Sequence, residues 1–232
     1  MTSPAKNRKT VKAQSFAAGV SFYKMAWVFV LGCVLGTWYE EILTYVTTGV
    51  YESRAGVMYG PFNPLYGTGF VIAVLLLHRL KRWFSVVLVG AIVFGAFEYG
   101  ANWAQEFFTG SVSWDYSELP LNILGRTTIH YALFWGLLAF VMVKGVYPIF
   151  SRLIERFPHR IGLAVTWFFI VFLSLNMFVS YSALIRQGLR VRGVEPFTPL
   201  GEFYDDYYTD EKISELFPNM QLLPKEDEEN GE

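Results

Sequence analysis

Charge is scarce in this chain: Asp, Glu, Lys and Arg make up 17% of its 232 residues, whereas 53% are hydrophobic. Soluble domains carry about 25% charged residues, so the composition excludes a disordered chain and most ordinary soluble folds. The single cysteine, Cys33, excludes an internal disulfide framework. A formal net charge of −1 excludes a broad basic surface, and we therefore expect no nucleic-acid partner.

Motifs of several enzyme classes are also missing. The three histidines, at positions 78, 130 and 159, lie in separate segments without the spacing of metal ligands. The sequence contains no P-loop, no GxSxG and no HExxH. We expect no metal, no cofactor and no ATPase chemistry in this chain, and the sequence assigns no catalytic residue.

Long uncharged runs are what the chain has instead. Five stretches contain no Lys, Arg, Asp or Glu, at residues 25–39, 55–77, 83–97, 127–143 and 161–185. A helix needs about 20 apolar residues to cross a bilayer, and an interfacial Trp, Tyr or single charge extends an apolar run. The sequence therefore predicts an all-α, multi-pass bundle of about five spans in the plasma membrane, in contact with lipids.

Basic residues indicate the orientation of these spans. Twelve Lys and Arg lie before the first run or in the loops after the second and fourth runs, against only Arg54 and Arg126 in the other two short loops. Basic loops remain in the cytoplasm, so we expect a cytoplasmic amino terminus and an outer carboxyl-terminal tail. Arg186, Arg190 and Arg192 follow the fifth run and favour the alternative, a cytoplasmic tail after a re-entrant fifth run.

The same features divide the chain into four parts. Residues 1–22 form a basic cytoplasmic segment, and residues 23–148 contain four spans. Residues 149–186 form a cytoplasmic loop and the fifth span. The polar tail at 187–232 contains a predicted short helix near 210–217 and ends in an acidic segment at 225–232.

The second run cannot be one plain helix. Its first half reads GPFNPLYGTG at residues 60–69, where proline removes a backbone donor and glycine weakens a helix. We expect a regular helix from Pro64 to Leu77, about 21 Å long, which is short of a hydrocarbon core of about 30 Å. Irregular backbone at membrane depth is tolerated where protein shields it or where it lines a wet cavity, so the segment at 60–69 is a candidate part of a binding site. The alternative is an outer loop followed by a short, tilted helix.

Polar residues are expected at one depth near the outer leaflet. Glu40 and Glu98 each lie sixteen residues beyond a basic residue at the cytoplasmic side, Lys24 and Arg82, which is about 24 Å along a helix. Charged groups in spans usually face the bundle interior or a cavity. The predicted cluster, used for binding or for structural pairing, comprises Glu40, Arg54, Tyr66, Glu98, Asn102, Asp115, Asn122, Arg126 and His130.

Particular contacts follow from these spacings. We expect Arg126 and His130 on one face of the fourth helix, with Asn122 as its cap. Carboxylates of the cluster, Asp115 and Glu98 among them, are expected to pair with Arg54 or Arg126. For Glu40 the alternative is a solvated position in the headgroup layer.

Small residues mark one face of the first span. Gly32 and Gly36 lie one turn apart and in line with Glu40, and small residues at this spacing let helices approach closely. This face is a predicted seam for a homodimer.

Five sequence motifs carry a family resemblance. They are GTWYEE at 36–41, RAGVMYGPFNPLYGTG at 54–69, FEY at 97–99, WDYSELPLNILGR at 114–126 and FWG at 134–136. In this order they resemble the CmpB-type family of putative ABC-transporter permeases over residues 25–148. The resemblance implies a multi-pass transport protein that works with a separate ATPase subunit. The matching backbone positions are Gly60, Pro61, Pro64 and Gly67, and the matching side chains include those of Glu40, Arg54, Glu98, Asp115, Asn122 and Arg126.

These observations favour a permease-like transporter with an outward-facing polar pocket. Arg54, Arg126 and helix amino termini would attract a small anionic or zwitterionic solute, while Glu40 and Glu98 would couple protons or bind a cationic group. One alternative is a membrane enzyme acting on a lipid or isoprenoid headgroup, with His130 or Glu98 as base and the two arginines as a phosphate clamp. The other is a non-catalytic assembly or regulatory subunit.

Overall fold

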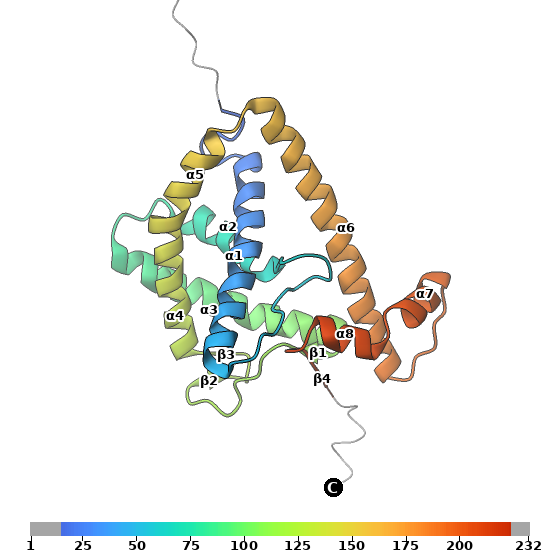
Figure 1. Ribbon diagram of the computed structural model, residues 1–232. Helices are drawn as coiled ribbons and strands as arrows, with labels where there is room; N and C mark the ends of the chain where they lie inside the picture. Colours follow the sequence, from blue (N-terminus) through green and yellow to red (C-terminus); the bar gives the residue numbers. More distant parts are fainter. Residues whose placement is uncertain (1–14, 224–232) are drawn as a thin grey trace, which may run out of the picture.

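The computed structural model of the protein describes residues 15–223. The basic cluster before residue 15 and the acidic end at 225–232 lie outside the described residues. Helices dominate the described part (Figure 1). They are α1 (Phe22–Thr48), α2 (Pro64–Leu77), α3 (Trp83–Thr109), α4 (Ile129–Phe140), the π-helical η1 (Val141–Val146), α5 (Tyr147–Glu155), α6 (His159–Val191), α7 (Pro199–Tyr207) and α8 (Asp210–Leu216). The short strands are β1 (Ser111–Val112), β2 (Asn122–Ile123), β3 (Thr127–Thr128) and β4 (Gln221–Leu222).

Four helical stretches of the described chain are long and apolar enough to cross a membrane. They are α1, α3, the continuous stretch Ile129–Glu155 and α6. Large apolar side chains cover the outside of these helices, and a row on α6 is more than half exposed: Trp167, Phe168, Val171, Leu175 and Phe178. Such extensive exposed apolar surface suits contact with lipid rather than with water. The predicted all-α membrane bundle is confirmed.

The fourth span is continuous but changes its winding. The π-helical turn η1 precedes Pro148, whose ring nitrogen cannot donate a hydrogen bond to the carbonyl of Lys144. Lys144 Nζ in turn donates to the carbonyl oxygens of His78 at 3.1 Å and Leu80 at 2.5 Å. The turn between α2 and α3 is thereby fastened to the fourth span.

The start of α1 is fastened to α5 by a buried cation. The Lys24 ammonium is only 1% exposed and forms an ion pair with Glu155. It also donates to Ser151 Oγ at 2.7 Å. Burying a lysine is costly unless it is paired, so this contact fixes the relative position of the first span and the end of the fourth.

The second apolar run is irregular in its first half and helical in its second half, as its proline and glycine residues predict. Residues 50–63 form neither helix nor strand, and α2 begins at Pro64 and ends at Leu77, as predicted. Asn63 caps it, because its Oδ1 accepts from the backbone N–H of Leu65 at 3.1 Å.

Close contact between α1 and α2 depends on glycine. A Cβ atom at Gly36 would lie 2.1 Å from Cγ of Tyr66, and one at Gly32 would lie 3.0 Å from the Cα of Gly67. The face of Gly32 and Gly36 is therefore filled by α2 of the same chain. The predicted homodimer seam at these glycines was wrong, because their small size serves packing within one chain.

Helix α6 runs obliquely to the other spans (Figure 1). Near its start, Thr166 Oγ1 accepts from Trp27 Nε1 of α1 at 2.8 Å. Farther along, Asn176 Nδ2 donates to the carbonyl of Tyr59, in the irregular segment before α2, at 2.7 Å. Near its end, a Cβ at Gly188 would lie 2.0 Å from the carbonyl oxygen of Thr109, so α6 packs directly on the end of α3.

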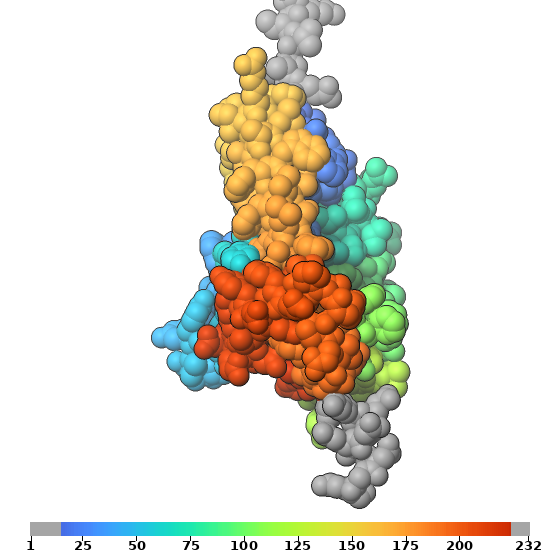
Figure 2. Space-filling view, turned by 90° about the vertical axis from the view of Figure 1, so that its right-hand side faces the viewer, coloured from blue at the N-terminus to red at the C-terminus, as the bar shows by residue number. Residues whose placement is uncertain are grey.

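The tail folds back onto this end of the bundle. Residues 194–223, which we call the C-terminal cap, contain α7, α8 and β4. Strand β4 pairs antiparallel with β1, with Ser111 opposite Leu222 and Val112 opposite Gln221. Figure 2 shows the cap, in orange and red, lying across the lower end of α6. The short helix predicted near 210–217 is α8.

Candidate functional site

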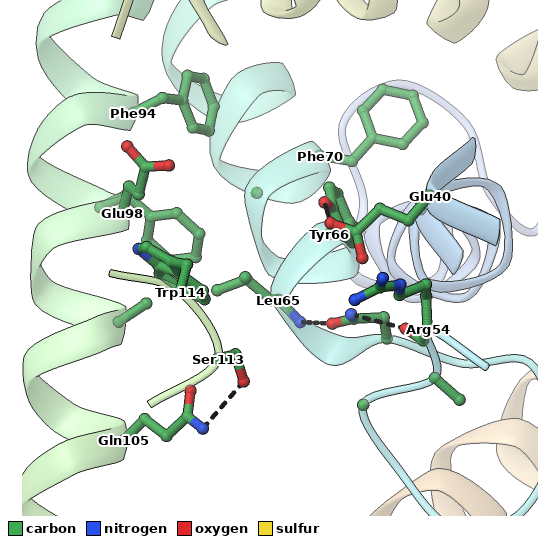
Figure 3. A pocket seen from close by; sticks show the side chains of 18 of the residues that line it. Glu40, Arg54, Leu65, Tyr66, Phe70, Phe94, Glu98, Gln105, Ser113 and Trp114 are labelled. Atoms are coloured by element: carbon green, nitrogen blue, oxygen red, sulfur yellow. Dashed lines mark hydrogen bonds between the residues drawn. The ribbon is translucent and has the colours of Figure 1, made fainter. Parts of the chain in front are cut away.

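A cavity of about 840 Å³ lies between α1, α2, α3, α4, α6 and the cap. Its polarity changes from one end to the other (Figure 3). One end is apolar and is lined by Phe70, Ala73, Phe94, Ala139 and Met142. The middle holds two carboxylates, and the opposite end includes the polar side chains of Gln105 and Ser113.

Glu98 of α3 is the more buried carboxylate, with an exposed fraction of 6%. Its oxygens accept three hydrogen bonds, from Thr127 Oγ1 at 2.6 Å, Trp135 Nε1 at 2.9 Å and Tyr116 OH at 3.2 Å. The donors come from β3, α4 and the loop after β1, so three segments converge on one side chain. All three donors are neutral, so they hold the carboxylate without cancelling its charge.

Glu40 of α1 lies across the cavity from Glu98 (Figure 3). Its Oε1 accepts a hydrogen bond from the Tyr66 hydroxyl of α2. The Tyr66 ring also approaches the ring of Trp135, with 6.2 Å between their centroids. The hydrogen-bond donors of the two carboxylates therefore contact each other, and Glu40 and Glu98 belong to one site.

Cations are sparse around these carboxylates. No Lys or Arg of the described chain lies within ion-pair distance of Glu40 or Glu98. Arg54 lines the cavity on the side of Glu40, but its Nη2 pairs with Glu52 at 2.8 Å and its Nε donates to Thr44 at 3.2 Å. The expected pairing of Glu98 with an arginine was therefore wrong, because neutral donors fill its coordination.

A second polar cluster lies next to the site and has a structural arrangement. Asn102, one turn beyond Glu98, accepts from Arg126 Nη1 at 2.7 Å and donates to the carbonyl of Trp114 at 2.8 Å. The same Arg126 nitrogen pairs with Glu106 at 2.5 Å. These contacts fasten the loop between β1 and β3 to α3. Neither Asn102 nor Arg126 lines the cavity.

The predicted roles of Asp115 and Asn122 were also wrong. Asp115 accepts from the backbone and side chain of Ser117, at 2.8 and 3.0 Å, and pairs with no arginine of the described chain. Asn122 bonds to loop carbonyls, whereas the cap of α4 is Thr128, whose hydroxyl accepts from Tyr131 N–H at 3.1 Å. Both short side chains stabilise turns in their own loop.

Arg126 and His130 do not share a helix face. Arg126 precedes α4 in the turn between β2 and β3, and His130 is an exposed residue in its first turn. His130 does not line the cavity. For the lipid-modifying enzyme, the expected base His130 and the clamp residue Arg126 thus lie outside the cavity, whereas the alternative base Glu98 and Arg54 line it.

Sequence reasoning assigned no role to several cavity residues. Trp135 lies within the FWG motif, but its bond to Glu98 could be found only from the packing of α3 against α4. Thr127, a hydrogen-bond donor to Glu98, and the cavity-lining cap residues Phe217, Asn219 and Met220 had no predicted role in the site. No local pattern marks them, because they reach the site through tertiary contacts.

Fold and site together define the class of the protein: a multi-pass helical membrane protein with an internal cavity that holds buried carboxylates. A family model described as "Putative ABC-transporter type IV" matches residues 27–181. This match covers more than half of the chain, which therefore belongs to that family. It confirms the predicted family, and it extends beyond the predicted limit at residue 148 into α6. No curated protein and no solved structure matches the chain.

Proposed function

We propose that this chain is the permease-type membrane subunit of a transporter, and that its cavity binds a zwitterionic amphipathic solute. The observation that carries the proposal is a largely apolar cavity with two carboxylates in its middle, neither of which is paired with a cation of the described chain. The family's description, "Putative ABC-transporter type IV", supports the transport part of the proposal; the cavity as binding site and the chemistry of the solute are our inferences.

The apolar end of the cavity favours a solute with a hydrocarbon part. Phe70, Phe94, Ala139 and Met142 line it with apolar side chains. Transfer of each CH₂ group from water to such surroundings contributes about 0.8 kcal/mol. A small, fully polar solute would lose its hydration there without compensation.

The middle of the cavity favours a cationic group. Glu98 and Glu40 supply negative charge, and the rings of Tyr66 and Trp135 supply aromatic faces beside them. Arg54 at the edge suits an anionic group, so a zwitterion satisfies both. A purely anionic solute has less support, because Arg126 lies outside the cavity and is already paired with Glu106.

The proposal includes an orientation in the plasma membrane. The basic residues of the turn after α2 and of the segment after α5 support a cytoplasmic amino terminus under the positive-inside rule. The carboxylates and the cap then belong to the outer half. Because this sequence has no P-loop, the ATPase would be a separate subunit. It would bind on the cytoplasmic side.

Equilibrium dialysis against the full chain in nanodiscs tests the solute class. The three labelled probes each carry a chain of sixteen carbon atoms: zwitterionic palmitoylcarnitine, cationic hexadecyltrimethylammonium and anionic palmitate. We expect palmitoylcarnitine to bind most tightly above the background of empty nanodiscs. Glu98→Gln should weaken the zwitterion and the cation about tenfold, equivalent to about 1.4 kcal/mol, and leave palmitate unchanged.

The matched control is Glu118→Gln, which removes a carboxylate from an exposed loop position. It should leave all three affinities unchanged. Tightest binding of palmitate, or binding no greater than to empty nanodiscs, would refute the proposed solute class. Loss of stability in Glu98→Gln without any change in binding would support the assembly-subunit alternative instead.

A further inference from the structure

The cap supplies part of the cavity wall. Phe217, Asn219 and Met220 line the cavity together with residues of the family-matched core. The family match ends at residue 181, before the cap begins. Residues that follow the matched segment therefore contribute to the cavity wall.

The cap lies at the polar end of the cavity. Gln105 Nε2 donates to Ser113 Oγ at 2.9 Å, which places this pair beside β1, the partner strand of β4. Asn219 and Met220 immediately precede β4. Along α3, Gln105 lies seven residues beyond Glu98, or about 10 Å, on the side away from Phe94 (Figure 3).

Ion pairs hold the cap in this position. Arg186 of α6 is 6% exposed and contacts Asp205 of α7 with two nitrogens, at 2.8 and 2.6 Å. Arg190 bonds to the same carboxylate at 2.7 Å and to Asp210 at 2.6 Å. A bidentate arginine–carboxylate contact fixes direction as well as distance. These contacts of Arg186 and Arg190 with Asp205 and Asp210, which we call the clamp, therefore set the orientation of α7 against α6.

Apolar contacts and one polar contact complete the attachment. Tyr204, Tyr208, Ile213 and Phe217 form a buried cluster with Ala183 and Leu184 of α6. The Tyr208 hydroxyl lies 2.7 Å from the hydroxyl of Tyr59, in the irregular segment before α2. The cap thus contacts α6, the end of α3 and this segment, all of which surround the cavity.

We propose that the cap forms the outer headgroup subsite, in which Asn219 and Gln105 contact the polar part of the solute and Met220 limits its size. This inference rests on the proposed function. With the hydrocarbon part at the apolar end and the cationic group at the carboxylates, the remainder of the headgroup extends toward the cap. The amide side chains of Asn219 and Gln105, which both line the cavity, offer donors and acceptors to such a group.

Binding of two zwitterionic probes with the ammonium attached to the same chain, but with heads of different size, tests the subsite. The full chain in nanodiscs is titrated with hexadecyl betaine, which has a small acetate head, and with hexadecyl sulfobetaine, which has a larger propanesulfonate head. Met220→Trp should weaken hexadecyl sulfobetaine about tenfold and change hexadecyl betaine less than twofold. Asn219→Leu should also weaken the larger probe selectively.

Two controls separate this effect from damage to the cap. Leu200→Trp adds the same bulk to α7 at an exposed position that does not line the cavity, and Met220→Leu keeps the apolar packing. Both should retain the unsubstituted ratio of affinities. Equal changes for both probes in Met220→Trp, or none, while the unsubstituted chain binds them, would overturn the subsite alone. Failure of the unsubstituted chain to bind either probe would refute the proposed function and the subsite with it.

Discussion

Replacing Glu98 separates its charge from its hydrogen bonds. In Glu98→Gln, the amide oxygen can still accept from Trp135 and Tyr116, and the Thr127 hydroxyl can turn to accept from the new NH₂ group. The free energy of unfolding should therefore fall by only about 1 kcal/mol. In Glu98→Leu all three donors lose their acceptor, at about 1–3 kcal/mol for each buried group, so we expect a loss of at least about 3 kcal/mol.

Thermal unfolding in nanodiscs measures the loss of stability, and dialysis of palmitoylcarnitine measures the loss of affinity. Glu98→Gln should keep most of the stability and lose about tenfold in affinity, whereas Glu98→Leu should lose both. Equal destabilisation by Gln and Leu would show that the charge itself supports the fold. Unchanged affinity in a stable Glu98→Gln chain would refute the assignment of this carboxylate to the cationic group.

Three further changes test separate parts of the account. Gly36→Ala places a methyl group 2.1 Å from Cγ of Tyr66, so unfolding should show a loss of about 1–3 kcal/mol; an unchanged midpoint would contradict the close contact of α1 and α2. Arg126→Gln should cost about 1–2 kcal/mol without altering palmitoylcarnitine affinity, and a selective loss of affinity would place Arg126 in the site. Arg186 and Arg190 hold the pKa of Asp205 below its ordinary value of 3.8. The stability from its ionised form is thus complete above that pH and is lost as pH falls through the lowered pKa. Pepsin should cleave the cap faster below about pH 4, and Asp205→Asn should remove most of this dependence; a pH dependence equal to that of the unsubstituted chain would contradict the clamp.

Much of the fold could be predicted because membrane spans and helix breaks are local in sequence. The uncharged runs located the spans, and the proline-rich segment placed the start of α2 at Pro64. The uncharged runs at 83–97 and 161–185 are shorter than α3 and α6, because polar residues such as Asn102 and Arg186 continue these helices when tertiary partners satisfy them. Charge-free runs therefore mark the centre of a span better than its ends.

The site was harder to predict because spacing along a span gives only the depth of a residue in the membrane, and not the direction in which its side chain points. Glu40 and Glu98 were placed at one level and do line one cavity. The same end of the bundle also holds Arg126, Asp115, Asn122 and His130. Depth alone does not specify which of these side chains face each other. Their partners depend on the loop conformation and on the rotation of α3 and α4. The cap residues reach the site because β4 pairs with β1. This pairing brings together residues that are more than a hundred positions apart in the sequence.

Photo-crosslinking tests the central claim, that the cavity rather than the lipid-facing surface binds the solute. The full chain in nanodiscs is irradiated with palmitoylcarnitine that carries a diazirine in its chain, and the modified residues are identified by mass spectrometry. The account predicts crosslinks to Phe94, Ala139 and Met142, with strong reduction in Glu98→Gln. Crosslinks confined to the exposed row of α6, such as Phe168 and Phe178, and insensitive to Glu98→Gln, would contradict it.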